Sequence, residues 1–329
     1  MVSFITPLFN KAPYIADTIT SVLKQTMDDW ELLVVDNLST DDGPKRVLSY
    51  SDPRIHLKAC MRKGVSATRN VGIGLARGEW LVFLDADDLI EPAYLEQQFE
   101  ALKMHPESNL IICSYQEFRD GVPDEVTVKS PVSGIPSKEK LMDTAIVFTP
   151  GPQHIFMVKR DLISPDLFWP ESLDVLLGED ATFWFRVICR AEVDFNPLPL
   201  ARYRIWAPNA RFTTLSEPAS LLDGIHAAVG ENLRFLSESG IAVTPGQAEN
   251  LMRFYAGVCE EAWRSGRHDV EARALGEARH WLRVHRRICR SPSLSMRVRS
   301  LIGLPAFIAL RRAGRILSVP YRHQSGLSA

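Results

Sequence analysis

Short apolar runs alternate with segments of helical periodicity through the first third of the chain. The runs that predict strands are Val2–Thr6, Trp30–Val35, Ile55–Lys58, Trp80–Leu84 and Leu110–Cys113. Between them, apolar residues recur at helical spacing around residues 15–23 and 66–76, where Ser66 is an expected cap, and Pro92 opens another predicted helix. Strands that alternate with helices predict an α/β fold with a mostly parallel sheet, covered by helices on both faces.

The pattern changes in the second half. Residues 121–136 are rich in Pro, Gly, Val and Ser, which predicts loops or short strands. A helix is predicted at Gly178–Arg190, and after Pro208 the sequence is mainly helical, over Leu221–Leu236, Ala248–Trp263 and Val270–Ile288. We therefore expect a helical region after the sheet.

Composition and cysteine usage indicate an ordinary intracellular protein. Of the 329 residues, 46% are apolar and 24% are charged, which is typical of a soluble globular chain. The five cysteines are scattered, which argues against a disulfide framework and a zinc site. Because the chain enters a strand at Val2 without an apolar leader, and has no run of about 18 apolar residues, we expect a cytoplasmic protein.

The net charge of −2 hides an asymmetry along the chain. From Ala278 onward there are 11 arginines and no Asp, Glu or Lys. A helix from Pro305 would place apolar residues on one side and arginines on the other, so residues 296–319 predict peripheral binding to an anionic membrane surface. The alternative is a helix packed on the rest of the protein with a solvated arginine face. Nucleic acid is a less favoured partner, because few aromatic residues interleave with the arginines.

Three carboxylates, Asp85, Asp87 and Asp88, follow the apolar run at Trp80–Leu84. Carboxylates at the end of a buried strand are costly to desolvate unless a cation or polar ligand compensates them. In an open α/β sheet the carboxyl end of the strands is where ligands bind. A divalent cation held by one or two carboxylates and by substrate phosphates satisfies both conditions. The alternative is that these acids only cap the next helix.

Six segments, taken together, resemble one known family. They are residues 2–10, 21–26, 30–43, 64–72, 85–88 and 178–180. In this order and spacing they are similar to the motifs of family 2 glycosyltransferases with the GT-A fold, over about residues 1–210. The resemblance implies a nucleotide-sugar-binding half at 1–100, an acceptor-binding half at 101–215 and a helical C-terminal region at 216–329. It also implies inverting hexosyl transfer from a UDP- or GDP-linked sugar to a glycan or lipid-linked acceptor, in the synthesis of a surface polysaccharide.

The resemblance assigns the donor contacts. Asp36 ends the second strand, where the family places a contact to the nucleotide; a turn-forming Asp is the alternative. Pro7 and Phe9 would line the base pocket, although Phe9 could also be plain core. Arg69 would recognise the base or the diphosphate, with an ordinary salt bridge as the alternative. Arg204 is a further candidate for a diphosphate contact.

The metal and the base follow from the same motifs. By resemblance, Asp87 coordinates Mg²⁺ or Mn²⁺ and Asp85 faces the ribose and the metal's water shell, where the ion stabilises the charge on the leaving diphosphate. Asp180 is the expected general base for the acceptor hydroxyl, with Glu179 beside it. The alternative is that Glu179 and Asp180 are only acids favoured in the first turn of a helix.

Two departures from the family pattern stand out. Trp206 occupies the place of a histidine that joins the metal site in many members, and Asn37 replaces the second acid after strand two. Trp cannot ligate a divalent ion, which leaves open a catalytically silent relative that binds a nucleotide or a partner. A nucleotidyltransferase is a third reading, but its Gly-rich basic loop after the first strand is not present at Pro7–Asn10.

Overall fold

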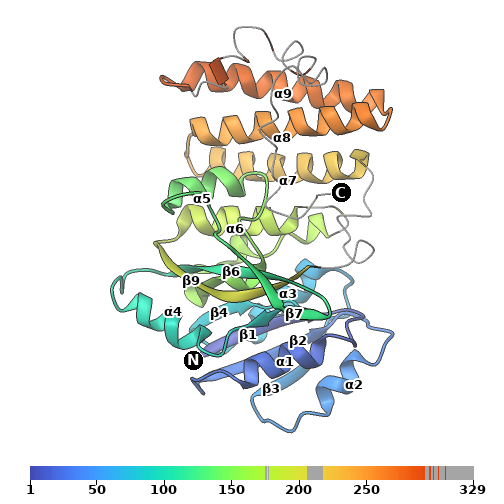
Figure 1. Ribbon diagram of the computed structural model, residues 1–329, viewed down its shortest axis with the longest axis vertical. Helices are drawn as coiled ribbons and strands as arrows, with labels where there is room; N and C mark the ends of the chain where they lie inside the picture. The colour runs from blue at the N-terminus through green and yellow to red at the C-terminus, as the bar shows by residue number, and fades with distance from the viewer. Residues whose placement is uncertain are drawn as a thin grey trace.

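The computed structural model describes residues 1–174, 176, 178–205 and 218–292, together with residues 296, 297, 299, 303 and 308. Figure 1 shows a sheet near the N-terminal end of the molecule and helices stacked above it. Within the described residues the sheet has nine strands, in the order β3-β2-β1-β4-β8-β6-β9-β5, with β7 paired to β6. The strands are β1 (Val2–Leu8), β2 (Trp30–Asp36), β3 (Ile55–Ala59), β4 (Trp80–Phe83), β5 (Leu89–Ile90), β6 (Leu110–Arg119), β7 (Val122–Lys129), β8 (Phe156–Lys159) and β9 (Val193–Ile205).

Strands β3, β2, β1 and β4 form a parallel block. Beyond it, β8 runs antiparallel to both β4 and β6, while β6 and β9 are parallel and β5 is antiparallel to β9. The expected α/β fold with a mostly parallel sheet is confirmed. Because β1, β2 and β4 are parallel neighbours, their carboxyl ends meet at one edge of the sheet, where the loops that follow Leu8, Asp36 and Phe83 are adjacent.

Helices cover the parallel block. They are α1 (Ile15–Leu23), α2 (Gly43–Leu48), α3 (Val65–Leu75) and α4 (Tyr94–Leu102). Every residue of β1 and β2 is buried except Pro7 and Asp36, which are half-buried at the ligand edge, as expected for a sheet covered on both faces. One sequence expectation about α3 is wrong: Gly64 occupies the N-cap position, and the buried Ser66 hydroxyl lies inside the helix without a hydrogen-bond partner.

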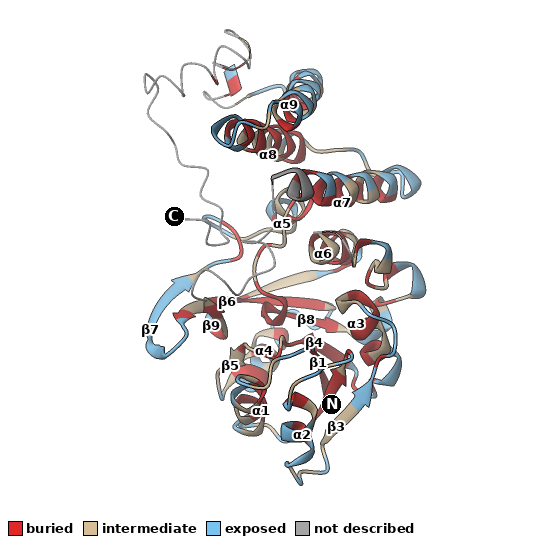
Figure 2. Ribbon diagram, turned by 90° about the vertical axis from the view of Figure 1, so that its right-hand side faces the viewer, coloured by how far each residue is buried: buried red, intermediate tan, exposed pale blue. Residues whose placement is uncertain are grey.

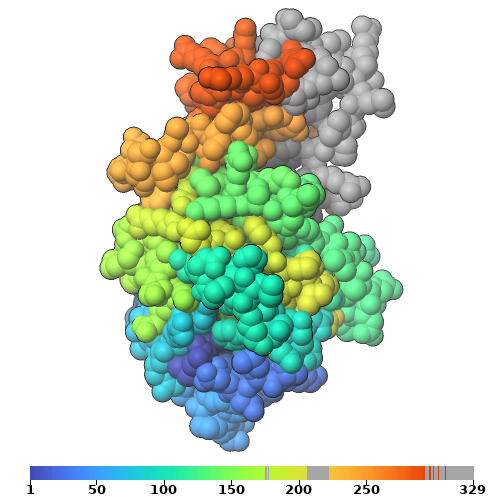
Figure 3. Space-filling view, turned by 90° about the vertical axis from the view of Figure 1, so that its left-hand side faces the viewer, coloured from blue at the N-terminus to red at the C-terminus, as the bar shows by residue number. Residues whose placement is uncertain are grey.

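The remaining helices form layers on the other side. They are α5 (Lys138–Ala145), α6 (Glu179–Arg190), α7 (Pro218–Glu238), α8 (Pro245–Arg264) and α9 (His268–Ile288). Figures 1 and 2 show α6 above the sheet, then α5 and α7, then α8 and α9, so that the predicted helical region is confirmed as a stack on the α6 side. Figure 3 shows the same succession on the surface, from the blue N-terminal end to the orange α8 and α9. Buried residues of the sheet and of these helices belong to one continuous core.

An aromatic cluster joins the sheet to α6. Trp184 of α6 stacks on Phe156 of β8, with ring centroids 4.0 Å apart, and Trp169 stacks on Phe183 at the same distance. Phe83, at the end of β4, makes edge contacts with Trp169, Phe183 and Trp184. These side chains are almost fully buried, so the start of α6 is fixed relative to the end of β4.

In the part of the chain that the structure describes, no helix has both the length and the apolar character needed to cross a bilayer. The amphipathic segment predicted from Pro305 falls, apart from Ile308, outside the described residues, as does Trp206.

Candidate functional site

The turn after β4 carries the three predicted carboxylates. Asp85 and Asp87 are partly exposed, with side-chain exposures of 31% and 15%, whereas Asp88 is buried at 2%. The Asp88 amide donates to the Asp85 carbonyl (3.1 Å), and the Thr18 hydroxyl of α1 donates to the Asp88 carbonyl (2.9 Å). The turn therefore aims two carboxylates outward from the sheet edge and one inward.

Arg69 connects this turn to the first turn of α6. Its guanidinium donates to Asp85 (2.9 Å) and lies 3.9 Å from Glu179 Oε1. The side chain is only 4% exposed and its guanidinium sits over the Trp169 ring, 4.1 Å from the centroid. The salt bridge considered as the alternative for Arg69 is therefore present. It brings together carboxylates that lie 94 positions apart in the sequence.

Asp87 faces a cation supplied by the chain. The Lys11 ammonium, in the loop after β1, lies 2.6 Å from Asp87 Oδ2. Sequence reasoning missed Lys11, although it directly follows Asn10 in the first motif segment. Its position balances one of the negative charges that the turn concentrates.

Asp88 and His154 form a buried pair. Burial and the charges of Asp87 and Asp85 hold the pKa of Asp88 well above its usual range. Burial lowers the pKa of His154 to about 4, so its ring is neutral at pH 7. His154 Nε2 faces the Arg202 carbonyl at 3.2 Å and therefore donates to it, which leaves Nδ1 as an acceptor. Nδ1 lies 3.5 Å from Asp88 Oδ2.

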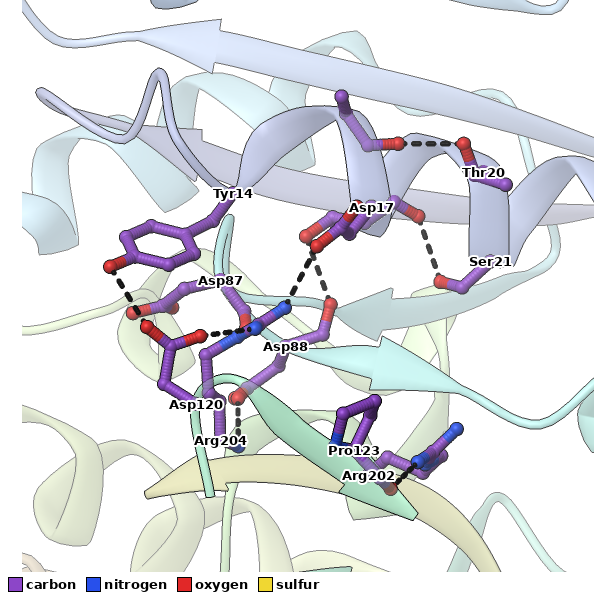
Figure 4. A network of polar contacts seen from close by, with 12 residues as sticks. Tyr14, Asp17, Thr20, Ser21, Asp87, Asp88, Asp120, Pro123, Arg202 and Arg204 are labelled. Atoms are coloured by element: carbon purple, nitrogen blue, oxygen red, sulfur yellow. Dashed lines mark hydrogen bonds and ion pairs between the residues drawn. The ribbon is translucent and has the colours of Figure 1, made fainter. Parts of the chain in front are cut away.

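Arg204 of β9 lies at the centre of the network in Figure 4. Its amide donates to Asp88 Oδ1 (2.8 Å) and its Nε donates to the Asp87 carbonyl (2.7 Å). Its terminal nitrogens pair with Asp120 (2.7 Å) and Asp17 (3.3 Å). The guanidinium is thus occupied by groups of this chain, and the predicted diphosphate contact of Arg204 would require release from Asp120 or Asp17.

The loops after β1 and β2 form the opposite side of the site. Asp36, the last residue of β2, accepts from the Ser39 amide (3.3 Å), so it lies in the turn considered as its alternative role and also at the ligand edge. Phe9 is 47% exposed, which excludes plain core. Asn10 and Leu38 both have positive φ angles, 51° and 63°, an uncommon and strained conformation that clusters at functional sites.

Asn37 has a structural role. Its amide donates to the carbonyls of Cys60 (3.1 Å) and Arg62 (2.7 Å), and its oxygen accepts from the Gly64 amide (2.9 Å). The asparagine that replaces the family's acid at this position therefore fixes the loop before α3.

Helix α6 begins with the two predicted acids. Gly178 precedes it with φ of 110°, where a side chain would meet Ala228. Burial and the neighbouring Asp180 raise the pKa of Glu179 to about 8, against the opposing effect of Arg69. Asp180 Oδ1 accepts from the Ala181 amide (2.7 Å), and Oδ2 accepts from the Gln153 side chain (3.4 Å). At neutral pH Glu179 is therefore protonated.

The fit of a divalent ion depends on Asp85 and Asp87. Within the described residues, no three His, Cys, Asp or Glu side chains are grouped so that they could hold a metal ion. Two outward carboxylates on one turn nevertheless match Mg²⁺ or Mn²⁺ sites in which substrate phosphates and waters complete the coordination. The donor set fits such an ion with few protein ligands.

Comparison with known proteins bears on the same region. Residues 3–164 match the family described as Glycosyl transferase family 2. The putative glycosyltransferase EpsH of Bacillus subtilis is 38% identical over 122 residues, which cover 36% of this chain and 35% of EpsH. The UDP-Glc:alpha-D-GlcNAc-diphosphoundecaprenol beta-1,3-glucosyltransferase WfgD of Escherichia coli is 41% identical over 103 residues, or 31% of this chain and 41% of WfgD. The teichuronic acid biosynthesis glycosyltransferase TuaG of B. subtilis, also described as putative, is 34% identical over 137 residues, or 40% of this chain and 54% of TuaG.

The chain thus matches about a third to a half of the length of these curated relatives. Among solved structures, residues 1–349 of TarS from S. aureus in complex with UDP superimpose with a TM-score of 0.64 at 18% identity, covering 96% of this chain and 93% of that one. This likeness confirms the fold, including the stack of helices after the sheet. The N-terminal part of this chain, which carries the acidic turn after β4, matches glycosyl transferase family 2 over residues 3–164.

Proposed function

We propose that this protein is an inverting glycosyltransferase that moves a hexose from a nucleoside-diphosphate sugar to a hydroxyl of a glycan or a lipid-linked acceptor. The observation that carries the proposal is the position of the buried Arg69, which donates to Asp85 at the donor edge and lies 3.9 Å from Glu179 beside the candidate base. Single displacement at a sugar carbon requires a donor site and a base site held close together.

In the proposed reaction, Asp180 takes the proton of the acceptor hydroxyl as its oxygen attacks the anomeric carbon. The bond between that carbon and the diphosphate breaks on the opposite face, and the nucleoside diphosphate leaves. Glu179 supports this assignment because its raised pKa keeps it protonated at pH 7, so that Glu179 itself is not available as the base. No second catalytic carboxylate is needed, because the reaction forms no covalent intermediate.

A uridine donor is the first choice. The TarS structures were determined with UDP and with UDP-GlcNAc, and WfgD is named for UDP-Glc. In this chain Asp36, Pro7 and the exposed Phe9 ring would receive the nucleoside. Asp85 and Asp87 would hold Mg²⁺ or Mn²⁺, which neutralises charge on the leaving diphosphate. Relatives named for succinoglycan and teichuronic acid biosynthesis support a surface polysaccharide as the product. We propose that the enzyme lies in the cytoplasm, at the periphery of the membrane.

Ligand-dependent thermal stability tests the donor site. A ligand present at a hundred times its dissociation constant stabilises a protein by about 2.7 kcal/mol. With an unfolding entropy of about 2.1 cal/mol/K per residue, this raises the melting temperature of a 329-residue chain by about 4 °C. We expect UDP to raise the melting temperature in the presence of Mn²⁺, and Asp87→Ala to abolish the Mn²⁺-dependent part. If UDP, GDP, CMP and dTDP all leave the melting temperature unchanged, the proposal fails. Binding without transfer in any assay would indicate the silent relative.

A further inference from the structure

Gln153 lies between the candidate base and the aromatic cluster. It sits in the short helical turn Gln153–Ile155 that precedes β8, and its side chain is buried, with 6% exposure. Its Nε2 lies 3.4 Å from Asp180 Oδ2, and its Oε1 accepts from Trp184 Nε1 at 2.5 Å. No motif singled out Gln153 in the sequence.

The chemistry of the indole decides the orientation of this amide. Trp Nε1 is a donor only, so the Gln153 atom that faces it must be the oxygen. Trp184 is fully buried and its ring is held between Phe156, Phe83 and Phe183, so the indole cannot turn to another acceptor without repacking the cluster. The amide nitrogen is thereby directed at Asp180. A buried donor left without an acceptor is costly, which keeps this arrangement in place.

We propose that Gln153 is a positioning residue for the base, with Trp184 as the group that fixes its orientation. Asp180 Oδ1 already accepts from the Ala181 amide, and Gln153 engages Oδ2 from the other side. Two donors then hold the plane of the carboxylate. The other charged groups around Asp180 are Glu179, which Asp180 raises in pKa, together with Arg69 and Asp174, which act on Glu179.

This inference rests on the proposed function, in which Asp180 is the base. The two are separated by measuring Asp180→Asn alongside the Gln153 variants. If Asp180→Asn keeps full activity, the assignment of the base fails. If Asp180→Asn is inactive while all Gln153 variants are fully active, the positioning role alone fails.

Three variants test the contact by steady-state kinetics of UDP release. Gln153→Met removes both hydrogen bonds, and we expect kcat to fall about tenfold, as for loss of one hydrogen bond to a charged group. Gln153→Glu keeps the acceptor for Trp184 but turns an oxygen toward Asp180. We expect a larger loss at pH 7 and a lower limb of the pH profile displaced to higher pH. Trp184→Phe removes the donor that fixes the Gln153 amide and so allows this amide to turn. The double variant Trp184→Phe/Gln153→Met should therefore lose little more kcat than Gln153→Met alone.

Gln25→Met is the matched control. Gln25 is also 6% exposed and also bonded, donating to the Glu91 carbonyl (2.8 Å), but it lies between α1 and β5. Its loss should lower stability and leave kcat and the pH profile unchanged. The KM for the donor and the thermal shift produced by UDP should stay constant in every variant. The inference is overturned if Gln153→Met and Gln25→Met change kcat equally, or if Gln153→Glu leaves the pH profile in place.

Discussion

Glu179→Gln should remove a large part of the pH dependence of stability. Glu179 has a pKa of about 8 in the folded protein and about 4.5 in the unfolded chain, because burial and Asp180 oppose its charge. A raised folded pKa means that the stabilising contribution is complete below pH 4.5 and is lost as the pH rises to 8. Between these values the folded protein holds one proton more than the unfolded chain, so the free energy of unfolding falls by about 1.4 kcal/mol per pH unit.

A glutamine in place of Glu179 is neutral in both states and removes this slope. From pH 5.5 to pH 7.5, wild type should therefore lose roughly 3 kcal/mol relative to Glu179→Gln, as measured by urea unfolding at each pH. Glu107→Gln, in which a 66%-exposed carboxyl is replaced, controls for the loss of one acidic side chain. Parallel pH dependences of wild type and Glu179→Gln would refute the reasoning.

The same variant separates the roles of the two acids in catalysis. Because Glu179 is protonated at neutral pH, Glu179→Gln should keep kcat within about tenfold, whereas loss of a general base costs about 10²–10⁴-fold. Should Glu179→Gln lose as much activity as Asp180→Asn, Glu179 would have to be reconsidered as the base.

Other predictions follow from backbone and burial. Gly178→Ala should destabilise the protein by roughly 1–3 kcal/mol in thermal unfolding, because the left-handed conformation strains a residue with a side chain and the added methyl meets Ala228. The control is Gly276→Ala, in open space on α9, which should stabilise the protein by about 0.5–1 kcal/mol. Equal effects of the two substitutions on stability would contradict the account. Asp88→Asn should raise the melting temperature at pH 7, since the burial that raises the pKa of Asp88 makes its ionised form costly and an amide can still accept from Arg204 and donate to His154. A lower melting temperature at pH 7 in Asp88→Asn would mean that Asp88 is ionised in the fold.

Most of the fold could be predicted from the sequence, because the patterns that indicate strands and helices lie within short segments. The apolar runs of β1, β2 and β4 and the periodicity of α8 and α9 predicted these elements within a few residues. The start of α3 was misassigned because Ser66 is a common capping residue, whereas the loop before α3 is fixed by the Asn37 side chain, which follows β2. Contacts between residues so far apart in the sequence produce no periodic pattern from which they could be predicted.

The candidate site was predictable where residues follow strand ends. Asp36, Asp85 and Asp87 do so, and their meeting at one edge follows from parallel pairing. The partners of these acids were not predictable, because Lys11, Gln153 and His154 reach the site only through tertiary packing. Arg204 was predicted as a diphosphate contact, and its carboxylate partners in the structure come from α1 and the β6–β7 turn, so they could not be predicted from its own segment.

The most direct test of the central claim is transfer itself, followed as UDP release and as labelled product from a panel of UDP-sugars, with bacterial lipid extract as the source of acceptor. The account predicts that one UDP-sugar yields both UDP and product with the wild-type protein. Asp180→Asn should yield neither, although UDP still raises its melting temperature. The claim is contradicted if the wild-type protein binds UDP but makes no product from any donor, or if Asp180→Asn transfers sugar as fast as wild type.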